Sequence, residues 1–502
     1  MTRAGDPTLH RSRILAGLML TMGLAAMDST IVATAVPAIV GDLSGFALFP
    51  WVFSVYVLVT AVCVPIYGKL ADLYGRRPML VVGTSIFLVG SMCCGIAWSM
   101  PALIGFRALQ GVGAGAIQSM TQTVVGDIYT IEERGRIAGW MSSVWGFSAV
   151  VGPAVGGLLS EYATWRWIFF INIPVGLGAM VLVIRYLRED VVRRPHRIDV
   201  VGAALLVAGA GLVVLGLLSG GIQWPWVSWQ SLVAIGGGIC SLVLFGLQER
   251  RAPEPILPTW VMGTRLLTGA NLGSMCVGLT VIGLTTYIPM FAQGVLGTGA
   301  VVAGFVLAVM SIGWPVASSQ SAKLYLRIGF RDTALLGVGA MFAATAIFLT
   351  VGVGDSPLHA AAGSVVMGVG LGLLSTPLLV GVQSVVGWGR RGVVTGAQMF
   401  TRTLGSALGA AIFGGIANST LSSWLQDAPT GIADQLPGSI NGASKLLSNG
   451  GGADPRVVAY VRDGLFEAVH WVFWGIGVVA VLALVVLLLT PRRFDPLDEE
   501  ME

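Results

Sequence analysis

Gly68-Lys69-Leu70-Ala71-Asp72-Leu73-Tyr74-Gly75-Arg76-Arg77 places a cluster of charged residues between two long apolar runs. Glycine permits close turns and helix ends that a side chain would block, and Gly68 and Gly75 flank the cluster. Asp72 and Arg76 are four residues apart and can meet across one helical turn. The stretch therefore predicts a tight charged hinge at a membrane surface, between two spanning helices.

The composition is that of a polytopic membrane protein. Of the 502 residues, 55% are hydrophobic and only 11% are charged, whereas about 25% charged residues is usual in soluble proteins. The mean hydropathy is +0.82, and an apolar run needs roughly 20 residues to cross a bilayer. We expect about fourteen such spans, at residues 13–36, 49–67, 79–98, 102–124, 136–159, 167–187, 200–219, 229–248, 267–293, 299–322, 333–352, 359–381, 395–418 and 467–490.

Basic residues are concentrated in every second predicted loop. The opposite loops carry only Arg166, Lys445, Arg456 and Arg462. Because cytoplasmic loops are enriched in Lys and Arg, the asymmetry predicts that both termini lie in the cytoplasm and that the loop at 421–466 is external. The formal charge of +4 is explained by this placement, so we expect a bilayer and no nucleic acid as the partner.

A later stretch, Lys323-Leu324-Tyr325-Leu326-Arg327-Ile328-Gly329-Phe330-Arg331, aligns with the hinge sequence from Lys69 to Arg77. Such an internal repeat suggests two related halves, each with its hinge on the cytoplasmic side. Leu326 occupies the position of Asp72. The two copies are therefore expected to share shape more than chemistry.

Three ionisable residues stand out within the predicted spans, away from the span ends: Asp28, Arg107 and Arg402. Such residues are costly in a membrane and are functional candidates by default. Asp28 is either a proton or substrate site or a structural hydrogen-bond acceptor. Arg107 belongs either to a hydrated cavity or to a polar interface between helices, and Arg402 is either a cavity residue or a structural anchor.

Polar residues recur at helical spacing after Arg107, which places them along one face of the fourth predicted span. A hydrated central cavity needs such a face. The candidate cavity residues are Gln110, Gln118, Gln122, Asn271, Gln293, Gln383, Gln398 and Arg402.

The sequence carries no motif of an ATP-driven pump or a membrane protease. No Walker A, H-E-x-x-H or G-x-S-x-G pattern occurs, and Gly111 to Ala116 resembles a dinucleotide fingerprint without the strand-turn-helix unit that such a site requires. We expect no enzyme, no metal and no cofactor. Energy must then come from an ion gradient or from the substrate's own gradient.

The chain resembles the major facilitator superfamily, and specifically its fourteen-span drug/proton antiporter branch. The resemblance covers nearly the whole chain. It rests on the hinge sequence, on Arg107 within residues 103–115, on residues 28–37 and 165–174, and on residues 146–157, which are similar to an antiporter motif. That last motif includes Gly152, Pro153, Gly156 and Gly157.

The resemblance implies an all-α major facilitator fold. It comprises an N-terminal six-helix bundle (residues 1–190), two inserted spans with linkers (191–258), a C-terminal six-helix bundle (259–492) and a cytoplasmic tail (493–502). It further implies a conformational latch formed by Gly68, Asp72, Gly75, Arg76, Arg77 and Asp127, held against the thirteenth span near Thr395. Asp28 and Arg107 would couple transport to protons.

The implied function is proton-coupled export of amphipathic small molecules by alternating access, by a monomer in a bacterial inner membrane. Spans nine to thirteen contain no acidic residue, so a neutral, lipophilic or weakly charged substrate fits better than a polycation. The competing interpretation is a dedicated exporter of one endogenous lipid, siderophore or secondary metabolite, since one fold can serve many functions. A non-transporting membrane receptor is a remote alternative.

Overall fold

The computed structural model describes residues 7–43, 48, 50–189, 199–220, 224–429, 432, 436 and 454–494. Most of these residues are helical. The helices of the first half are α1 (Pro7–Ile31), η1 (Val32–Ala35), α2 (Val36–Leu43), α3 (Pro50–Tyr74), α4 (Arg76–Gly95), α5 (Met100–Ile128), α6 (Ile131–Tyr162), α7 (Trp167–Phe170) and α8 (Asn172–Tyr186).

The remaining helices follow the same up-and-down pattern. They are α9 (Val200–Ser219), α10 (Trp229–Ser231), η3 (Leu232–Gly236), α11 (Gly237–Glu249), α12 (Trp260–Gly263), α13 (Arg265–Gly294), α14 (Ala300–Ala308), α15 (Met310–Ile328), α16 (Phe330–Thr350), α17 (Pro357–Ser384), η4 (Trp388–Arg390), α18 (Arg391–Gln426) and α20 (Pro455–Leu489).

Thirteen helical segments in the described ranges are long and apolar enough to cross a membrane. The fourth predicted span corresponds to α5, which is also long enough but is not among the thirteen. Its stripe of Arg and Gln lowers its mean hydropathy, which is the same feature that made it a functional candidate. With α5 included, the helices correspond to the fourteen predicted spans, and the all-α fold is confirmed.

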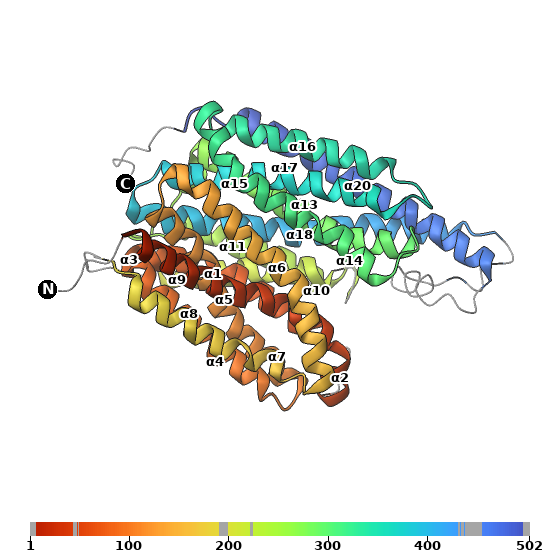
Figure 1. Cartoon of the computed structure of the whole chain (residues 1–502), viewed down its shortest axis with the longest axis horizontal. Helices are drawn as coiled ribbons and strands as arrows, with labels where there is room; N and C mark the ends of the chain where they lie inside the picture. Colours follow the sequence, from red (N-terminus) through yellow and green to blue (C-terminus); the bar gives the residue numbers. More distant parts are fainter. Residues whose placement is uncertain are drawn as a thin grey trace.

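The helices form two bundles, one containing α1 to α8 and the other α13 to α20 (Figure 1). Within the bundles, α5 packs on α3 and α4, and α17 packs on α15 and α16. The bundles meet along two seams, where α3 contacts α18 and α6 contacts α15. Both seams reach the end of the molecule where the hinge sequence lies.

The two inserted spans, α9 and α11, pack against both bundles. One apolar cluster joins Val62 of α3, Leu206 of α9, Phe245 of α11 and Phe400 of α18. The inserted pair therefore covers the outer side of the α3–α18 seam. The linker residues 190–198 lie outside the described residues.

The hinge and its repeat have the same backbone shape. Gly75 has φ 96° and ψ 157°, and Gly329 has φ 91° and ψ 163°. Side chains strongly disfavour this region, so both positions require glycine. Each glycine directly precedes a helix, α4 or α16, as expected for two related halves.

Two helices extend well into the loop expected at 421–466. α18 continues to Gln426 and α20 begins at Pro455, where Asp454 caps the helix and proline suits its first turn. Near these ends the two helices pack through Trp424 and Tyr460, which donate hydrogen bonds to each other's carbonyls at 3.2 and 2.6 Å. Residues 430–431, 433–435 and 437–453 of this loop, and 495–502 of the tail, lie outside the described residues.

Candidate functional site

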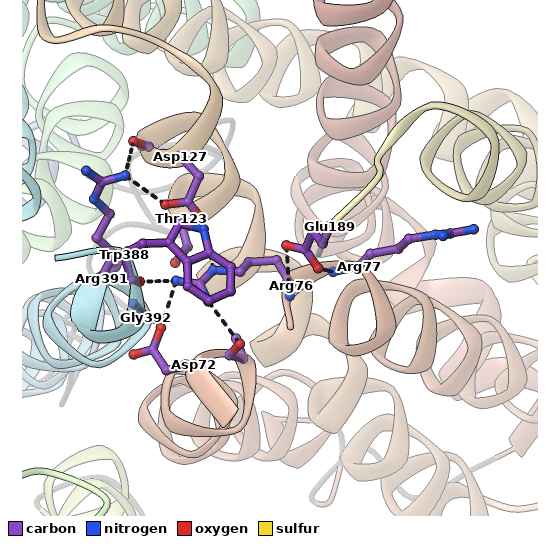
Figure 2. A network of polar contacts seen from close by, with 12 residues as sticks. Asp72, Arg76, Arg77, Thr123, Asp127, Glu189, Trp388, Arg391 and Gly392 are labelled. Carbon is purple, nitrogen blue, oxygen red and sulfur yellow. Dashed lines mark hydrogen bonds and ion pairs between the residues drawn. The ribbon is translucent and has the colours of Figure 1, made fainter. Parts of the chain in front are cut away.

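Asp72 at the end of α3 ties the first half to the second (Figure 2). Its carboxylate accepts hydrogen bonds from the backbone N–H groups of Gly392 and Val393, each at 2.9 Å. These N–H groups belong to the first turn of α18, where a helix favours negative charge. Arg76 also pairs with Asp72 at 2.9 Å.

Arg76 is fully buried at the centre of this network. Its Nε atom lies 2.9 Å from Asp127 of α5, and its guanidinium lies 3.6 Å from the ring centroid of Trp388. It also donates to the carbonyl of Trp388. Arg391 pairs with the other oxygen of Asp127 at 3.0 Å. We call Asp72, Arg76, Asp127, Trp388, Arg391 and Gly392 the latch.

Backbone contact completes the latch. A Cβ atom at Gly68 would lie 2.5 Å from the carbonyl oxygen of Gly392, and one at Gly392 would lie 2.3 Å from that of Gly68. Neither position can carry a side chain while α3 and α18 are in contact. The latch thus meets α18 within one helical turn of Thr395, whose own hydroxyl accepts a hydrogen bond from Gln383 at 3.0 Å.

The resemblance placed the second-half side of the latch near Thr395, but it did not name Trp388, Arg391 or Gly392. The sequence does not single out Trp388 or Arg391, because nothing local shows which helix these residues will meet. The Arg390-Arg391 pair next to the start of a span was the available signal.

Arg77 lies outside the latch and points away from Asp72 and Asp127 (Figure 2). Its side chain donates to the carbonyl of Ile184 at 2.7 Å. Glu189, in the segment after α8, accepts from the backbone N–H groups of Arg76 and Arg77 at 3.1 and 2.9 Å. Burial raises the pKa of Glu189. The described segment that follows α8 is thus attached to the first turn of α4 through Glu189.

The repeat of the hinge forms the second seam without an acid. Tyr325 of α15 donates its hydroxyl proton to the carbonyl of Ile131, the first residue of α6. The ring of Tyr325 stacks on Phe330 with centroids 4.9 Å apart. A Cβ atom at Gly139 of α6 would lie 2.8 Å from that of Ser319 on α15. Both the hinge and its repeat therefore contact the opposite half. The hinge does so through a carboxylate, and the repeat does so through an uncharged hydroxyl.

Asp28 and Arg107 form an ion pair inside the first bundle. The carboxylate of Asp28 lies 2.5 Å from Nη1 of Arg107, and both side chains have no exposed surface. Gln110 accepts from Arg107 and donates to Asp28, each at 2.8 Å. Asn172 of α8 donates at 3.3 Å to the oxygen of Asp28 that also accepts from Gln110. The pair is thus enclosed by α1, α5 and α8.

Arg107 has further contacts that hold its guanidinium in place. Its Nε atom donates to the carbonyl of Val52 at 3.2 Å. The central carbon of the guanidinium, Cζ, lies 4.1 Å from the ring centroid of Tyr56. Its Nη2 atom has no hydrogen-bond partner among the described residues. Losing Asp28 would therefore leave a buried charge with no acidic partner, contacted by the Gln110 amide oxygen, one carbonyl and an aromatic face.

A central cavity of about 250 Å³ lies between the two bundles. Of the predicted cavity residues, Gln118, Gln122 and Arg402 line it. A smaller cavity of about 50 Å³ adjoins it and shares Gln122 and Arg402, and Gln398 lines only this smaller cavity. The rest of the central lining is mostly apolar.

The other predicted cavity residues lie elsewhere. Gln110 belongs to the buried ion-pair network, Gln383 donates to the carbonyl of Gln122 at 3.2 Å beneath the cavity, and Asn271 donates to the carbonyl of Val261 at 3.4 Å. Gln293 is near the far end of α13 and lines neither cavity. Helical periodicity assigns polar residues to one face of a helix, but it does not show which neighbour each part of that face meets.

The predicted antiporter motif lies in α6, which is continuous from Ile131 to Tyr162 and includes Pro153. A Cβ atom at Gly152 would lie 2.1 Å from the hydroxyl of Thr30 on α1, so this glycine is a point of close helix contact. Gly156 is buried. Gly157 has open space around it, so a side chain there would meet no neighbour.

The chain matches a family model described as Major Facilitator Superfamily over residues 18–410. Multidrug transporter protein MdtP of Bacillus subtilis (strain 168) is 31% identical over 518 residues, covering 99% of this chain and 96% of that protein. Multidrug resistance protein 3 of the same strain is 34% identical over 419 residues, covering 84% and 82%.

Among solved structures, a bacterial homologue of the iron transporter ferroportin in an outward-facing state shares the fold. The TM-score is 0.59 at 12% identity, covering 93% of this chain and 99% of that one. The family model spans most of the chain, and MdtP aligns over almost its full length. The chain therefore belongs to the Major Facilitator Superfamily and is a membrane transporter rather than an enzyme.

Proposed function

We propose that the protein is a proton-coupled exporter of amphipathic small molecules that works by alternating access. The observation that carries this proposal is the ion pair between Asp28 and Arg107, with both side chains fully buried. Protonating Asp28 removes the partner of a buried cation, and breaking a buried pair costs about 3–5 kcal/mol. A change of this size is enough to move the equilibrium between two conformations of a transporter.

The arrangement of the latch and the cavity supports this mechanism. The latch and the second seam close one end of the molecule, which we propose is the cytoplasmic end in a bacterial inner membrane. Asp28 lies six residues beyond Met22, which lines the cavity, and six helical residues span about 9 Å. Asp28 thus lies farther from the latch than the cavity does, and we propose that the proton arrives from that opposite side while the cytoplasmic side is closed.

The names of the relatives support the substrate class. MdtP is called a multidrug transporter and the second relative a multidrug resistance protein. The cavity has an apolar lining with a few polar side chains, as is usual for sites that bind small amphipathic molecules.

The deciding experiment compares wild type with Asp28→Asn in proteoliposomes. An imposed pH gradient should drive wild-type transport of at least one dye from a panel of amphipathic fluorescent dyes that differ in charge. Asp28→Asn should lose the gradient-driven component but keep downhill substrate exchange, because an amide cannot carry the proton. Size-exclusion chromatography checks that the variant remains folded.

Asp42→Asn is the matched control, because it removes an exposed carboxylate from the same half. It should transport like wild type. If Asp28→Asn retained full gradient-driven transport, Asp28 would have no part in coupling and the proposal would fail.

A further inference from the structure

We infer that the substrate carries a negatively charged head group, and that Arg402 and Gln398 of α18 bind it. This inference rests on the proposed export function and adds a charge sign and two contact residues to it. It is carried by the geometry of α18 where that helix borders the two cavities.

Arg402 lies deep within its span. It is eleven residues after Arg391, which corresponds to about 16 Å along the helix axis, roughly half of a hydrocarbon core. Its side chain is half-buried, and its guanidinium has no hydrogen bond or ion pair to any other described residue. Intramembrane arginines normally pair with an acid or with carbonyls. A guanidinium left free at this depth, facing a cavity, is available to a ligand.

Gln398 provides an independent observation. It is one helical turn before Arg402 on the same face, and its side chain is only 1% exposed. Neither its Oε1 nor its Nε2 atom has a hydrogen-bond partner among the described residues. Because buried amides are normally satisfied, this amide indicates an absent ligand or its water in the small cavity that it lines with Arg402.

The charge of the side chains that line the two cavities determines whether an anionic or a cationic ligand is favoured. Arg402 is the one charged residue among the described residues that line the two cavities. A guanidinium and an amide N–H are both donors, which match a carboxylate, sulfonate or phosphate group. A quaternary ammonium group would instead meet a like charge with no carboxylate to offset it.

The apolar part of the lining selects an organic anion over an inorganic one. Met22, Met141, Met310, Trp314 and Met399 face the central cavity. Flexible thioether side chains adapt to apolar groups of different shapes. The head group would occupy the small polar cavity while the hydrocarbon part fills the larger one.

Binding to purified protein in zwitterionic lipid nanodiscs tests this inference without requiring transport. The probes are decanesulfonate, decanol and decyltrimethylammonium, which share a ten-carbon chain and differ in charge. Wild type should bind tritiated decanesulfonate, and unlabelled probes should displace it in the order anion, alcohol, cation. Empty nanodiscs give the background.

The Arg402 variants test the assigned residue. Arg402→Gln should weaken decanesulfonate binding by about tenfold or more, since a charged hydrogen bond has this effect, and should change decanol binding less than twofold. Arg402→Lys should retain part of the affinity, and Gln398→Leu should lose part. Arg456→Gln, which removes an exposed arginine at the external start of α20, should bind like wild type.

Three results would overturn the inference: tighter binding of the cation, unchanged anion affinity in Arg402→Gln, or displacement by chloride as effective as by decanesulfonate. If a folded Arg402→Lys lost all binding while Arg402→Gln kept it, a structural role would replace the assigned one. These outcomes are separate from the coupling experiment, because a protein that binds the anion but shows no proton-driven transport contradicts only the proposed function.

Discussion

Two aspartates of the first half show how surroundings decide what a carboxylate can do. Asp28 is enclosed by three helices and paired with Arg107, so loss of its charge would leave a buried cation without its acidic partner. Asp42 is exposed and accepts hydrogen bonds from Arg166 at 2.6 Å and from the indole N–H of Trp165 at 3.1 Å. It joins α2 to the segment before α7 without entering the transport pathway.

At this residue scale, stability should depend on the charge of Asp42. The hydrogen bond from Arg166 holds the pKa of Asp42 below its usual range. Because a depressed pKa stabilises the folded state above the unfolded pKa, the contribution is present at neutral pH and is lost as pH falls through the folded value. The Tm values of wild type and Asp42→Asn should differ by a constant amount at pH 5–8, and this difference should disappear below about pH 4. A difference that instead grew at low pH would show that another group dominates.

At the scale of elements, the hinge and its repeat have the same backbone conformation but contact the opposite half through different chemical groups. Asp72 binds the first turn of α18 through its charge, whereas Tyr325 binds the first residue of α6 through a neutral hydroxyl. Leu326, the counterpart of Asp72, is half exposed. The prediction that the two halves share shape more than chemistry is therefore confirmed, but both copies contact the opposite half.

Asp72→Asn should weaken the α3–α18 contact, because it removes the charge that binds two N–H groups and Arg76. A loss of about 1–3 kcal/mol corresponds to a 5- to 150-fold change between conformations, and turnover should fall. Leu326→Asn is the matched control at the equivalent position and should change transport little. Transport rates in proteoliposomes measure both. Equal damage from the two substitutions would mean that the hinge only anchors topology.

At the scale of the whole molecule, the closed end depends on two seams built from glycine. Gly68 and Gly392 allow α3 and α18 to touch, and Gly139 does the same for α6 and α15. Each seam must separate for the cavity to open toward the hinge side. Any side chain at these positions therefore acts against the closed conformation.

Gly139→Leu should shift the population toward the conformation open at the hinge end. Its Cβ atom would lie 2.7 Å from the carbonyl oxygen of Pro315, and overpacking costs about 1–3 kcal/mol. A cysteine at Gln118, which lines the cavity, should then react faster with an impermeant maleimide in inside-out vesicles. Gly157→Leu on the same helix meets no neighbour and should leave the rate unchanged. An unchanged rate in both variants would contradict a role for this seam in closure.

The sequence by itself determined the class of protein, the number of spans and the shape of the hinge. Apolar length and the two hinge glycines act locally, so their consequences could be predicted without knowing any contact between helices. Asp28 and Arg107 were also identifiable as candidates, because an ionisable residue inside a span is costly wherever it lies.

Only the tertiary structure decided which residues meet. It joined Asp127 to Arg391, enclosed Gln110 with Asp28, and left the side chains of Arg402 and Gln398 facing cavities with no hydrogen-bond partner in the part of the chain that the structure describes. These pairings join residues up to hundreds of positions apart, and they depend on how helices rotate about their axes when the bundles pack. The periodicity of one helix defines its faces, but only the packing of neighbouring helices determines whether a polar face forms an ion pair, a seam or a binding site.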